Sequence, residues 1–391
     1  MRRRAYRYRI YPGREQQILL AKTFGCCRFI YNRMLSDKKE WYEKHHEMLR
    51  TTPAQYKKEY EWLKEVDSLA LANVQLHLER AYRNFFRDPK VGYPRYKSKH
   101  RARQSYTTNA VNGNIRIEGK QLRLPKVGKV KVKLHRQIPK EAVLKSVTIT
   151  REATGKYYAS ILCEEPEPEN QRPPEKAEDA KILGIDYAMQ GMGVLSDGTR
   201  AEYPGYYRKG QEKLAREQRK LTHCKKGSRN YEKQRRRVAI CHEKIRNQRA
   251  DYQHKLSRKL ADQYDAVAVE DLDMKGLSRC LQLGKGVMDN AFGSFLQKLS
   301  YKLEEEGKEL IRIDRWYPSS QICSGCGSIH PEVKNLSVRI WFCDHCLQFH
   351  DRDLNAARNI REEGRHLLKK SKQRTAGQAG IACGYLVRQD H

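Results

Sequence analysis

The stretch KILGIDYAMQGMGVLSDGTR, residues 181–200, decides the fold. Its first part, ILGID, is a short apolar run, which is typical of a strand that is covered on both faces. A turn and a second strand follow, and the second strand ends at Asp197 and Gly198, a pair that favours a tight hairpin. Asp186 closes the first strand, so this stretch also places a carboxylate at the end of a buried strand.

Two further apolar runs continue the pattern toward the C-terminus. YDAVAVEDL (264–272) predicts a second buried strand, and ELIRIDRWYP (309–318) predicts a strand that leads into the cysteines. Residues 206–223 and 229–262 precede these runs and predict a basic helical hairpin, while residues 290–306 predict a helix between them. Strands that alternate with helices indicate an α/β layer.

Cysteines with metal-ligand spacing follow the third strand. Cys323, Cys326, Cys343 and Cys346 form two C-x2-C pairs that are sixteen residues apart. Four thiolates at this spacing can close a tetrahedron around Zn²⁺ with no position open for a substrate, so they predict a structural site. A disulfide interpretation is poor for a reducing compartment. The neighbouring His330, His345 and His350 are expected to be polar surface groups or nucleic-acid contacts.

Carboxylates stand at or just past the apolar segments. Asp186 closes ILGID, Glu270 closes AVAVE, and Asp351 and Asp353 follow the second cysteine pair. Buried carboxylates need a partner, and a divalent cation is the usual one. Two Mg²⁺ ions about 3.5 to 4 Å apart would let such a cluster hydrolyse a phosphodiester. Each acid by itself is equally compatible with a helix cap or a salt bridge.

The N-terminal half has a different organisation. Residues 6–10 predict a strand with one basic face, residues 14–88 predict several helices, and residues 105–163 predict a small antiparallel sheet or barrel that the first strand could join. VGYPRYKSKHRAR (91–103) interleaves tyrosines with cations, which suits base stacking and phosphate contact. A solvated basic loop is the alternative. The acidic, Pro-rich stretch at 164–180 marks the main domain boundary.

Charge restricts the class of partner. The chain has 391 residues and a formal net charge of +32, which favours a polyanion as partner, and nucleic acid is the default. A membrane surface is the rival, but no apolar run approaches the roughly 18 residues of a spanning helix, and no secretory signal is recognised at the start. A reducing, cytoplasmic location is therefore expected, and the odd number of cysteines, eleven, agrees with it.

Several motifs together resemble one family. LGIDYAMQGMGVLSDG, AVAVEDLDMKGL, YPSSQICSGCG with its second CDHC, and HDRDLNAARNI come in the order and spacing of the TnpB family, the transposon-encoded relatives of type V CRISPR effectors. RYRIYP, FIYNRML and GYPRYKSK are also similar to that family, so the resemblance covers about residues 4 to 364. It implies an α/β multidomain protein with an RNase H-like RuvC nuclease domain.

The resemblance also implies domain limits. They are a wedge β-barrel at 1–12 and 105–168, a helical recognition domain at 13–104, an acidic Pro-rich linker at 169–178, a RuvC-like nuclease domain at 179–318 and 350–365, a zinc-ribbon target-nucleic-acid-binding insert at 319–349, and a basic flexible tail at 366–391. The chain would thus return to the nuclease core at HDRD to deliver its last ligand.

Site residues are carried over in the same way. Asp186, Glu270 and Asp353 are the implied catalytic magnesium ligands, with Asp351 as the fallback for the third, and Asn355 would support the start of the metal-binding helix. The expected nucleic-acid contacts are Arg4, Tyr93, Arg95, Tyr96, Lys97 and Arg352. The implied cofactors are one structural Zn²⁺ and two catalytic Mg²⁺.

The implied activity is RNA-guided cleavage of double-stranded DNA beside a short adjacent motif. The expected partners are a guide RNA from the transposon end and the target DNA, with one protein monomer on one RNA and no membrane. Two alternatives remain: a nuclease-inactive guided repressor, which would be expected to lack an acid, and a zinc-ribbon nucleic-acid-binding accessory protein of transposition, in which the acids are structural.

Overall fold

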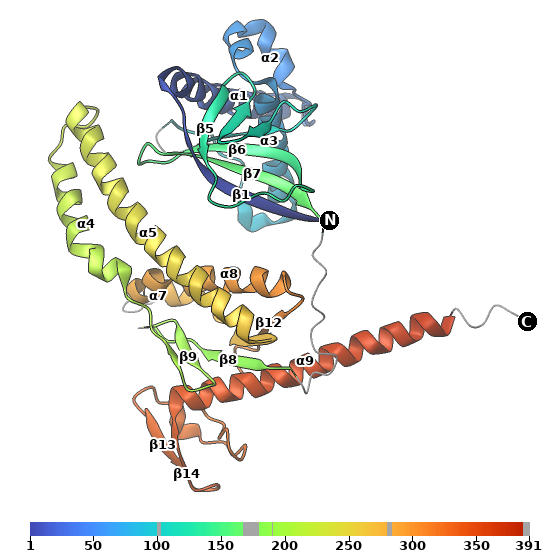
Figure 1. The fold of residues 1–391 in the computed structure, drawn as a ribbon, viewed down its shortest axis with the longest axis vertical. Helices are drawn as coiled ribbons and strands as arrows, with labels where there is room; N and C mark the ends of the chain where they lie inside the picture. Colours follow the sequence, from blue (N-terminus) through green and yellow to red (C-terminus); the bar gives the residue numbers. More distant parts are fainter. Residues whose placement is uncertain (100–102, 167–179, 190, 280–283, 386–391) are drawn as a thin grey trace, which may run out of the picture. The chain divides into compact units, whose positions relative to one another are not determined.

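The computed structural model describes residues 1–99, 103–166, 180–189, 191–279 and 284–385 (Figure 1). The chain divides into two compact units, Met1–Glu167 and Pro168–His391. The linker expected at 169–178 lies outside the described residues. None of the helices in these described ranges is both long enough and apolar enough to cross a membrane.

An antiparallel seven-stranded sheet forms the centre of the first unit. Its strands are β1 (Arg2–Tyr11), β2 (Gln104–Asn109), β3 (Arg116–Glu118), β4 (Gln121–Leu124), β5 (Gly128–Lys133), β6 (Val143–Arg151) and β7 (Tyr157–Glu165). They are ordered β2-β6-β7-β1-β5-β4-β3. Because β1 pairs with both β5 and β7, the prediction that the first strand joins this sheet is confirmed.

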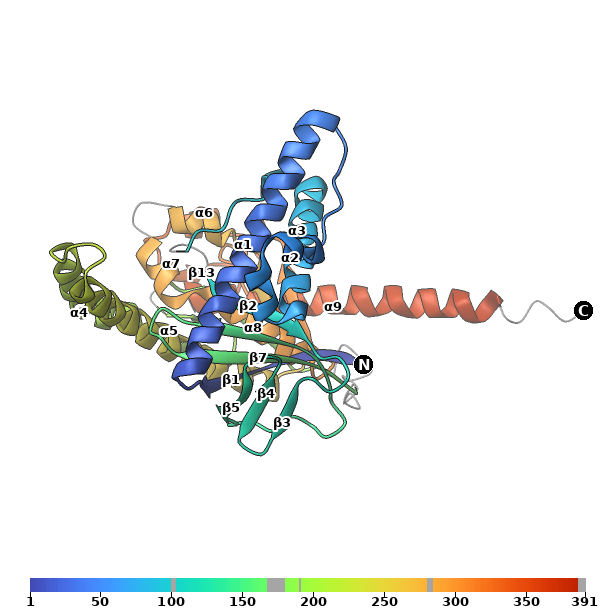
Figure 2. The same ribbon diagram turned by 90° about the horizontal axis from the view of Figure 1, so that it is seen from above.

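The helices of the first unit come between β1 and β2 in the sequence. They are α1 (Arg14–His45), α2 (Pro53–Glu59) and α3 (Ser68–Arg87), with 3-10 turns at Glu61–Glu65 and Pro89–Val91. The apolar stripe of α1, which includes Leu20, Phe24 and Tyr31, is buried in the same core as Tyr8 and Ile10 of β1. Helices α1 and α3 pack together and against β2 (Figure 2).

A mixed five-stranded sheet forms the centre of the second unit. Its strands are β8 (Ile182–Asp186), β9 (Gly193–Leu195), β10 (Arg200–Ala201), β11 (Ala266–Glu270) and β12 (Glu309–Ile313), in the order β10-β9-β8-β11-β12. Strands β8, β11 and β12 are parallel, and β9 and β10 run antiparallel to their neighbours. All three apolar runs of the sequence are therefore strands of one sheet.

Helices lie on both faces of this sheet, with α8 and the C-terminal end of α5 on one face and α9 on the other. The helices in the described part of this unit are α4 (Tyr206–Thr222), α5 (Arg229–Gln263), α6 (Met274–Arg279), α7 (Gly284–Asn290), α8 (Phe292–Glu304) and α9 (Arg352–Tyr385). Side chains alternate along each strand, so Ile185 and Val269 pack with Phe295 of α8, whereas Ile182 and Ala268 pack with α9 on the opposite face (Figure 1).

Helix α9 continues beyond residue 365, where the nuclease domain was expected to end. Residues 366–385 are helical, in contrast to the expected flexible tail, and residues 386–391 lie outside the described ranges. As far as Leu368 the helix is held by apolar burial: Ile360 and Leu368 are both buried against the sheet, with Leu367 packed beside them.

Glycines allow α9 to lie directly on the strands. A Cβ atom built on Gly184 of β8 would lie 2.0 Å from the Ala357 carbonyl oxygen and 2.6 Å from the Arg361 amide nitrogen. A Cβ atom on Gly364 of α9 would lie 2.4 Å from Cβ of Ala268. The stretch of α9 from Ala357 to Gly364 therefore lies directly on the middle of β8 and β11.

Gly184→Ala is expected to destabilise the second unit by about 2–3 kcal/mol, because two backbone atoms of α9 must move to admit the new methyl group. Urea unfolding followed by circular dichroism measures this change. Gly293→Ala is the matched control, since a Cβ atom there meets nothing within 4 Å and should be neutral or slightly stabilising. Equal stability of the two variants would contradict the close packing of α9 on β8.

Candidate functional site

Two carboxylates lie at the ends of adjacent parallel strands. Asp186 is the last residue of β8, and Glu270 is the last residue of β11. Ile185 is paired with Val269, so Asp186 and Glu270 come next in register at the same edge of the sheet. By the alternation of side chains along a strand, both belong to the face that α9 covers.

The third candidate acid comes from the start of α9. Asp353 lies in the first turn of this helix, which follows β14 (Gln348–Asp351) without a break. The helix passes over β8 and β11, so the chain returns to the sheet immediately after the cysteine pairs. Strand order, register and helix position together bring Asp186, Glu270 and Asp353 into one region.

Burial and mutual repulsion act on these acids. Burial raises the pKa of Asp186 well above its ordinary value, and the negative charges of Glu270 and Asp353 raise it further, while Arg352 lowers it. Burial also raises the pKa of Glu270, against a hydrogen bond that Ser319 Oγ donates to Glu270 Oε1 over 2.6 Å. The positive charge of Arg352 does not offset burial and repulsion at Asp186, and a divalent cation would supply further positive charge.

The oxygens of the three acids are not gathered around one point. Within the described ranges, the only sets of three or more ligand atoms that all lie within 4.8 Å of one another contain cysteines. Asp353 Oδ1 is instead 3.4 Å from Arg339 Nη1. The carboxylate oxygens and the repulsion between their charges fit a divalent cation. Asp353 would exchange its ion pair with Arg339 for a contact with that cation.

Asp351 has a different set of partners from Asp353. Its Oδ1 accepts a hydrogen bond from the Leu354 backbone N–H at 2.9 Å, which caps the N-terminus of α9. Its Oδ2 lies 3.2 Å from Arg200 Nη2. Both oxygens of Asp351 thus make contacts that stabilise the fold. Asp353, in contrast, carries one of the two negative charges that raise the pKa of Asp186.

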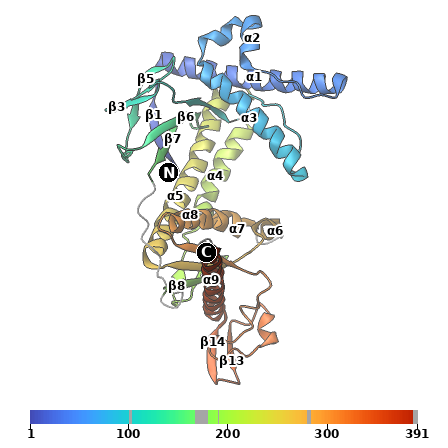
Figure 3. The ribbon, with the colours of Figure 1, turned by 90° about the vertical axis from the view of Figure 1, so that its right-hand side faces the viewer.

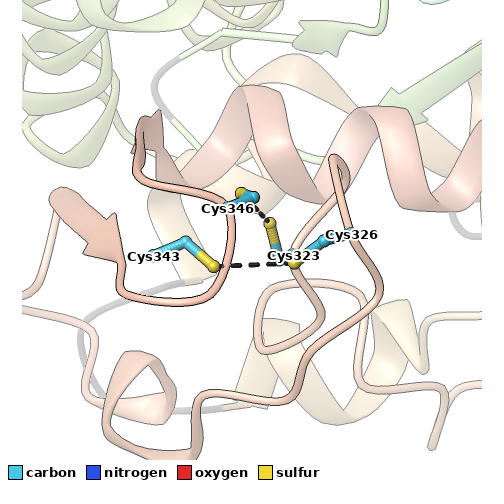
Figure 4. Close-up of side chains that lie close together, drawn as sticks. All are labelled: Cys323, Cys326, Cys343 and Cys346. Atoms are coloured by element: carbon cyan, nitrogen blue, oxygen red, sulfur yellow. Dashed lines mark hydrogen bonds between the residues drawn. The ribbon is translucent and has the colours of Figure 1, made fainter.

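The four cysteines of the two C-x2-C pairs converge on one point. Cys326 Sγ is 3.7 Å from Cys343 Sγ, and Cys323 Sγ is 3.5 Å from Cys346 Sγ (Figure 4). A tetrahedral Zn²⁺ with Zn–S bonds of about 2.3 Å requires sulfurs roughly 3.8 Å apart. All four sulfurs lie within 4.8 Å of one another, so the cluster fits one such ion.

A small hairpin carries the second cysteine pair. It consists of β13 (Ile340–Cys343) and β14, which lie together next to the start of α9 (Figure 3). The expectation of surface positions is wrong for His330 and His350, because both are buried and their rings pack against Trp341. His350 Nε2 lies 3.2 Å from Cys323 Sγ. His345 is exposed, as expected.

The contacts of two polar residues, Ser319 and Asn355, could not be predicted from the sequence. Ser319, which contacts Glu270, belongs to the quoted YPSSQICSGCG motif but carried no assigned function. Asn355 was expected to support the start of α9. It lies near the start of α9 and bonds the chain on either side of Cys323: its Nδ2 donates to the Ile322 carbonyl and its Oδ1 accepts from the Ser324 N–H, each at 2.8 Å.

The candidate nucleic-acid contacts differ in exposure. Arg95 and Tyr96 are exposed. Tyr93 is also exposed, but its hydroxyl lies 2.8 Å from that of Tyr82. The ammonium of Lys97 lies 3.8 Å from the ring centroid of Tyr31.

Two arginines complete this set. The Arg4 guanidinium is 6.0 Å from the ring centroid of Tyr6 in the first unit. Arg352, in the second unit, is buried, and its Nη1 lies 3.5 Å from the Asn335 carbonyl. Arg95 and Tyr96 are thus the members of the set that present the most accessible side chains.

Family models match most of the chain. A model described as "Probable transposase" (OrfB_IS605) matches residues 160–281, and a model described as "Cas12f1-like, TNB domain" matches residues 292–360. A third, described as "Helix-turn-helix domain", matches residues 1–47, which fold here as β1 followed by the single helix α1.

Whole-length relatives give a consistent picture. A protein of Streptomyces pristinaespiralis named "Putative RNA-guided DNA endonuclease" is 36% identical, over 99% of this chain and 92% of its own length. A protein of Escherichia coli with the same name and the suffix InsQ is 29% identical, over 99% of this chain and 95% of its own.

One solved structure is similar in fold. The protein in a Cas12f1-sgRNA-target DNA complex is 12% identical, has a TM-score of 0.56 and covers 92% of this chain and 98% of that chain. At this identity the likeness concerns the fold alone, and it agrees with the mixed α/β organisation of the chain.

Proposed function

Since the chain belongs to the TnpB family of RNA-guided DNA endonucleases, we propose that it cuts double-stranded DNA beside a short adjacent motif under the direction of a guide RNA from the transposon end. The observation that carries the proposal is the pair Asp186 and Glu270, in register at the ends of parallel strands, with the pKa of both carboxyls raised. Such a pair gains from a cation and from the phosphodiester that the cation binds.

Each acid has a role in this proposal. Asp186, Glu270 and Asp353 would hold two Mg²⁺ ions, which when bound would activate a water and stabilise the leaving oxygen. Asp186 lies under the influence of both other charges and is the central ligand. Ser319 fixes one oxygen of Glu270, and the ion pair of Arg339 with Asp353 is the contact that the ions would replace.

The other expected components belong to the same proposal. One structural Zn²⁺ on the four cysteines would stabilise the insert at 319–349 inside a RuvC-like domain at 179–318 and 350–365. The helical part at 13–104 and the wedge barrel at 1–12 and 105–168 would hold one guide RNA and the target DNA, as a monomer in the cytoplasm. A net charge of +32 suits a long RNA together with DNA.

Two alternative functions are less well supported. A nuclease-inactive guided repressor would be expected to lack an acid, yet the chain contains Asp186, Glu270 and Asp353. An accessory zinc-ribbon protein of transposition would not need the raised pKa values of Asp186 and Glu270 at one edge of the sheet. Endonuclease action therefore explains more of the molecule than either alternative.

The test is cleavage of a plasmid by the purified ribonucleoprotein with Mg²⁺, using a matched and a mismatched guide. We expect cleavage with the matched guide alone, and a rate at least about 10²-fold lower for Asp353→Asn because a metal ligand is lost. Asp351→Asn is the matched control. It should retain most of the activity and nearly all of the stability, because the asparagine Oδ1 can accept the same capping hydrogen bond from the Leu354 N–H.

Three results would contradict parts of this proposal. Tight target binding by the unaltered ribonucleoprotein without cleavage would favour the repressor. The absence of both guided target binding and cleavage would favour the accessory protein. A larger loss of cleavage for Asp351→Asn than for Asp353→Asn would move the third ligand to Asp351.

A further inference from the structure

Helix α9 is bonded to the first cysteine pair by two asparagines one turn apart. Asn359 Nδ2 donates to the carbonyls of Ser319 and Ile322, at 2.7 and 2.6 Å. Asn355 bonds the carbonyl of Ile322 and the N–H of Ser324. Because residues i and i+4 lie on the same side of a helix, both amides face the chain on either side of Cys323.

The same chain segment reaches the candidate nuclease site. Ser319, whose carbonyl accepts from Asn359, donates its own hydroxyl hydrogen to Glu270 Oε1 over 2.6 Å. A continuous series of hydrogen bonds thus runs from α9 through Ser319 to the acid at the end of β11. It lies within the second unit and combines residues from three separate parts of the sequence.

All three linking side chains are buried. Asn355 is 1% exposed, Asn359 is 4% exposed and Ser319 is 6% exposed. A buried amide without a hydrogen-bond partner raises the free energy of the folded state, so these bonds are strongly favoured. They fix the position of the Ser319 backbone. A serine whose backbone is fixed in this way can hold a carboxylate in one rotamer.

We propose that Ser319 and Asn359 are positioning residues for Glu270. Through them, the fold of the cysteine module, the insert at 319–349 that carries the four clustered cysteines, is coupled to divalent-cation binding at the nuclease site. The inference depends on the proposed function, in which Glu270 is a metal ligand. Ser319 occupies Oε1 of Glu270, which orients the carboxylate and leaves its other oxygen for the cation. Asn359 keeps Ser319 in place, so its effect on Glu270 is indirect.

Ser319→Ala in the full-length ribonucleoprotein tests the first link. Binding of Mn²⁺, a paramagnetic substitute for Mg²⁺, is followed by electron paramagnetic resonance, and zinc content and guide RNA affinity are measured on the same samples. We expect Mn²⁺ affinity to fall about 10- to 100-fold, with zinc and RNA binding unchanged. Ser319→Thr keeps the hydroxyl and should restore Mn²⁺ affinity. Unchanged Mn²⁺ binding by Ser319→Ala would overturn the proposal.

Asn359→Asp tests the second link, because it keeps the size of the side chain but removes the two donated hydrogen bonds. We expect weaker Mn²⁺ binding with zinc retained. Asn247→Asp, at an exposed position of α5, is the control and should bind Mn²⁺ normally. Loss of zinc by Asn359→Asp with normal Mn²⁺ affinity would overturn the coupling.

These readouts separate the inference from the proposed function. If the unaltered protein binds Mn²⁺ but never cuts matched DNA, the endonuclease proposal fails while the effect of Ser319 on the cation is still measured. If matched DNA is cut and Ser319→Ala cuts at the same Mg²⁺ concentrations as the unaltered protein, the endonuclease proposal stands and the positioning role fails.

Discussion

Asp186→Asn is expected to lower the rate of target cleavage by about 10³-fold or more, while guide RNA affinity stays within about twofold. The substitution removes the carboxylate whose pKa is raised by burial and by the charges of Glu270 and Asp353. Loss of several kcal/mol of charge stabilisation at a metal site corresponds to a rate change of this size. Single-turnover cleavage of matched plasmid measures it.

The same variant should make the metal-free protein more stable, and this gain should depend on pH. The pKa of Asp186 is raised in the folded state, so the carboxyl contributes stability that is full below its unfolded pKa of about 3.9 and is lost as pH rises through the folded value. The gain in melting temperature for Asp186→Asn should therefore be small near pH 4 and larger at pH 7 to 8.

Thermal melts from pH 4 to 8 in magnesium-free buffer, without a chelator that would strip zinc, test this expectation. Asp251→Asn is the control, because Asp251 is exposed and forms an ion pair with Lys255 on the surface of α5. A pH-independent difference between Asp186→Asn and the unaltered protein would remove the electrostatic argument for a cation site. Cleavage at the unaltered rate would remove Asp186 from the catalytic site.

The second sheet could be predicted because its strands are local sequence features. ILGID and AVAVE are short apolar runs that each end in a carboxylate, ELIRI alternates apolar with charged residues, and all three form parallel strands of this sheet. The position of α9 could not be predicted in the same way. Its packing depends on Ile360 and Leu368 meeting the sheet, a contact between segments far apart in the chain.

The candidate acids were also visible in the sequence, since Asp186 and Glu270 end apolar runs. The choice between Asp351 and Asp353 was not, because it depends on which residue caps α9 and which charge reaches Asp186. His330 and His350 were assigned to the surface for a similar reason. Only the folded hairpin shows that both pack on Trp341.

The cysteine module permits the second large prediction, which concerns Cys343. Cys343→Ser removes one of four clustered sulfurs, and structural zinc contributes roughly 10–16 kcal/mol to the folding of such modules. We expect the purified variant to lose its zinc and the module to unfold locally. Atomic emission spectroscopy measures the zinc, and limited proteolysis between residues 319 and 351 measures the unfolding.

Cleavage should fall together with zinc, because the module supports the nuclease site at two points. Asp353 begins α9 directly after β14, and Ser319, at the entrance to the module, bonds Glu270. We therefore expect at least about 10²-fold slower cleavage by Cys343→Ser. Cys241→Ser, on α5 and outside the cluster, should keep both zinc and activity. Zinc loss without any loss of cleavage would show that the acids are placed independently of the cysteine module.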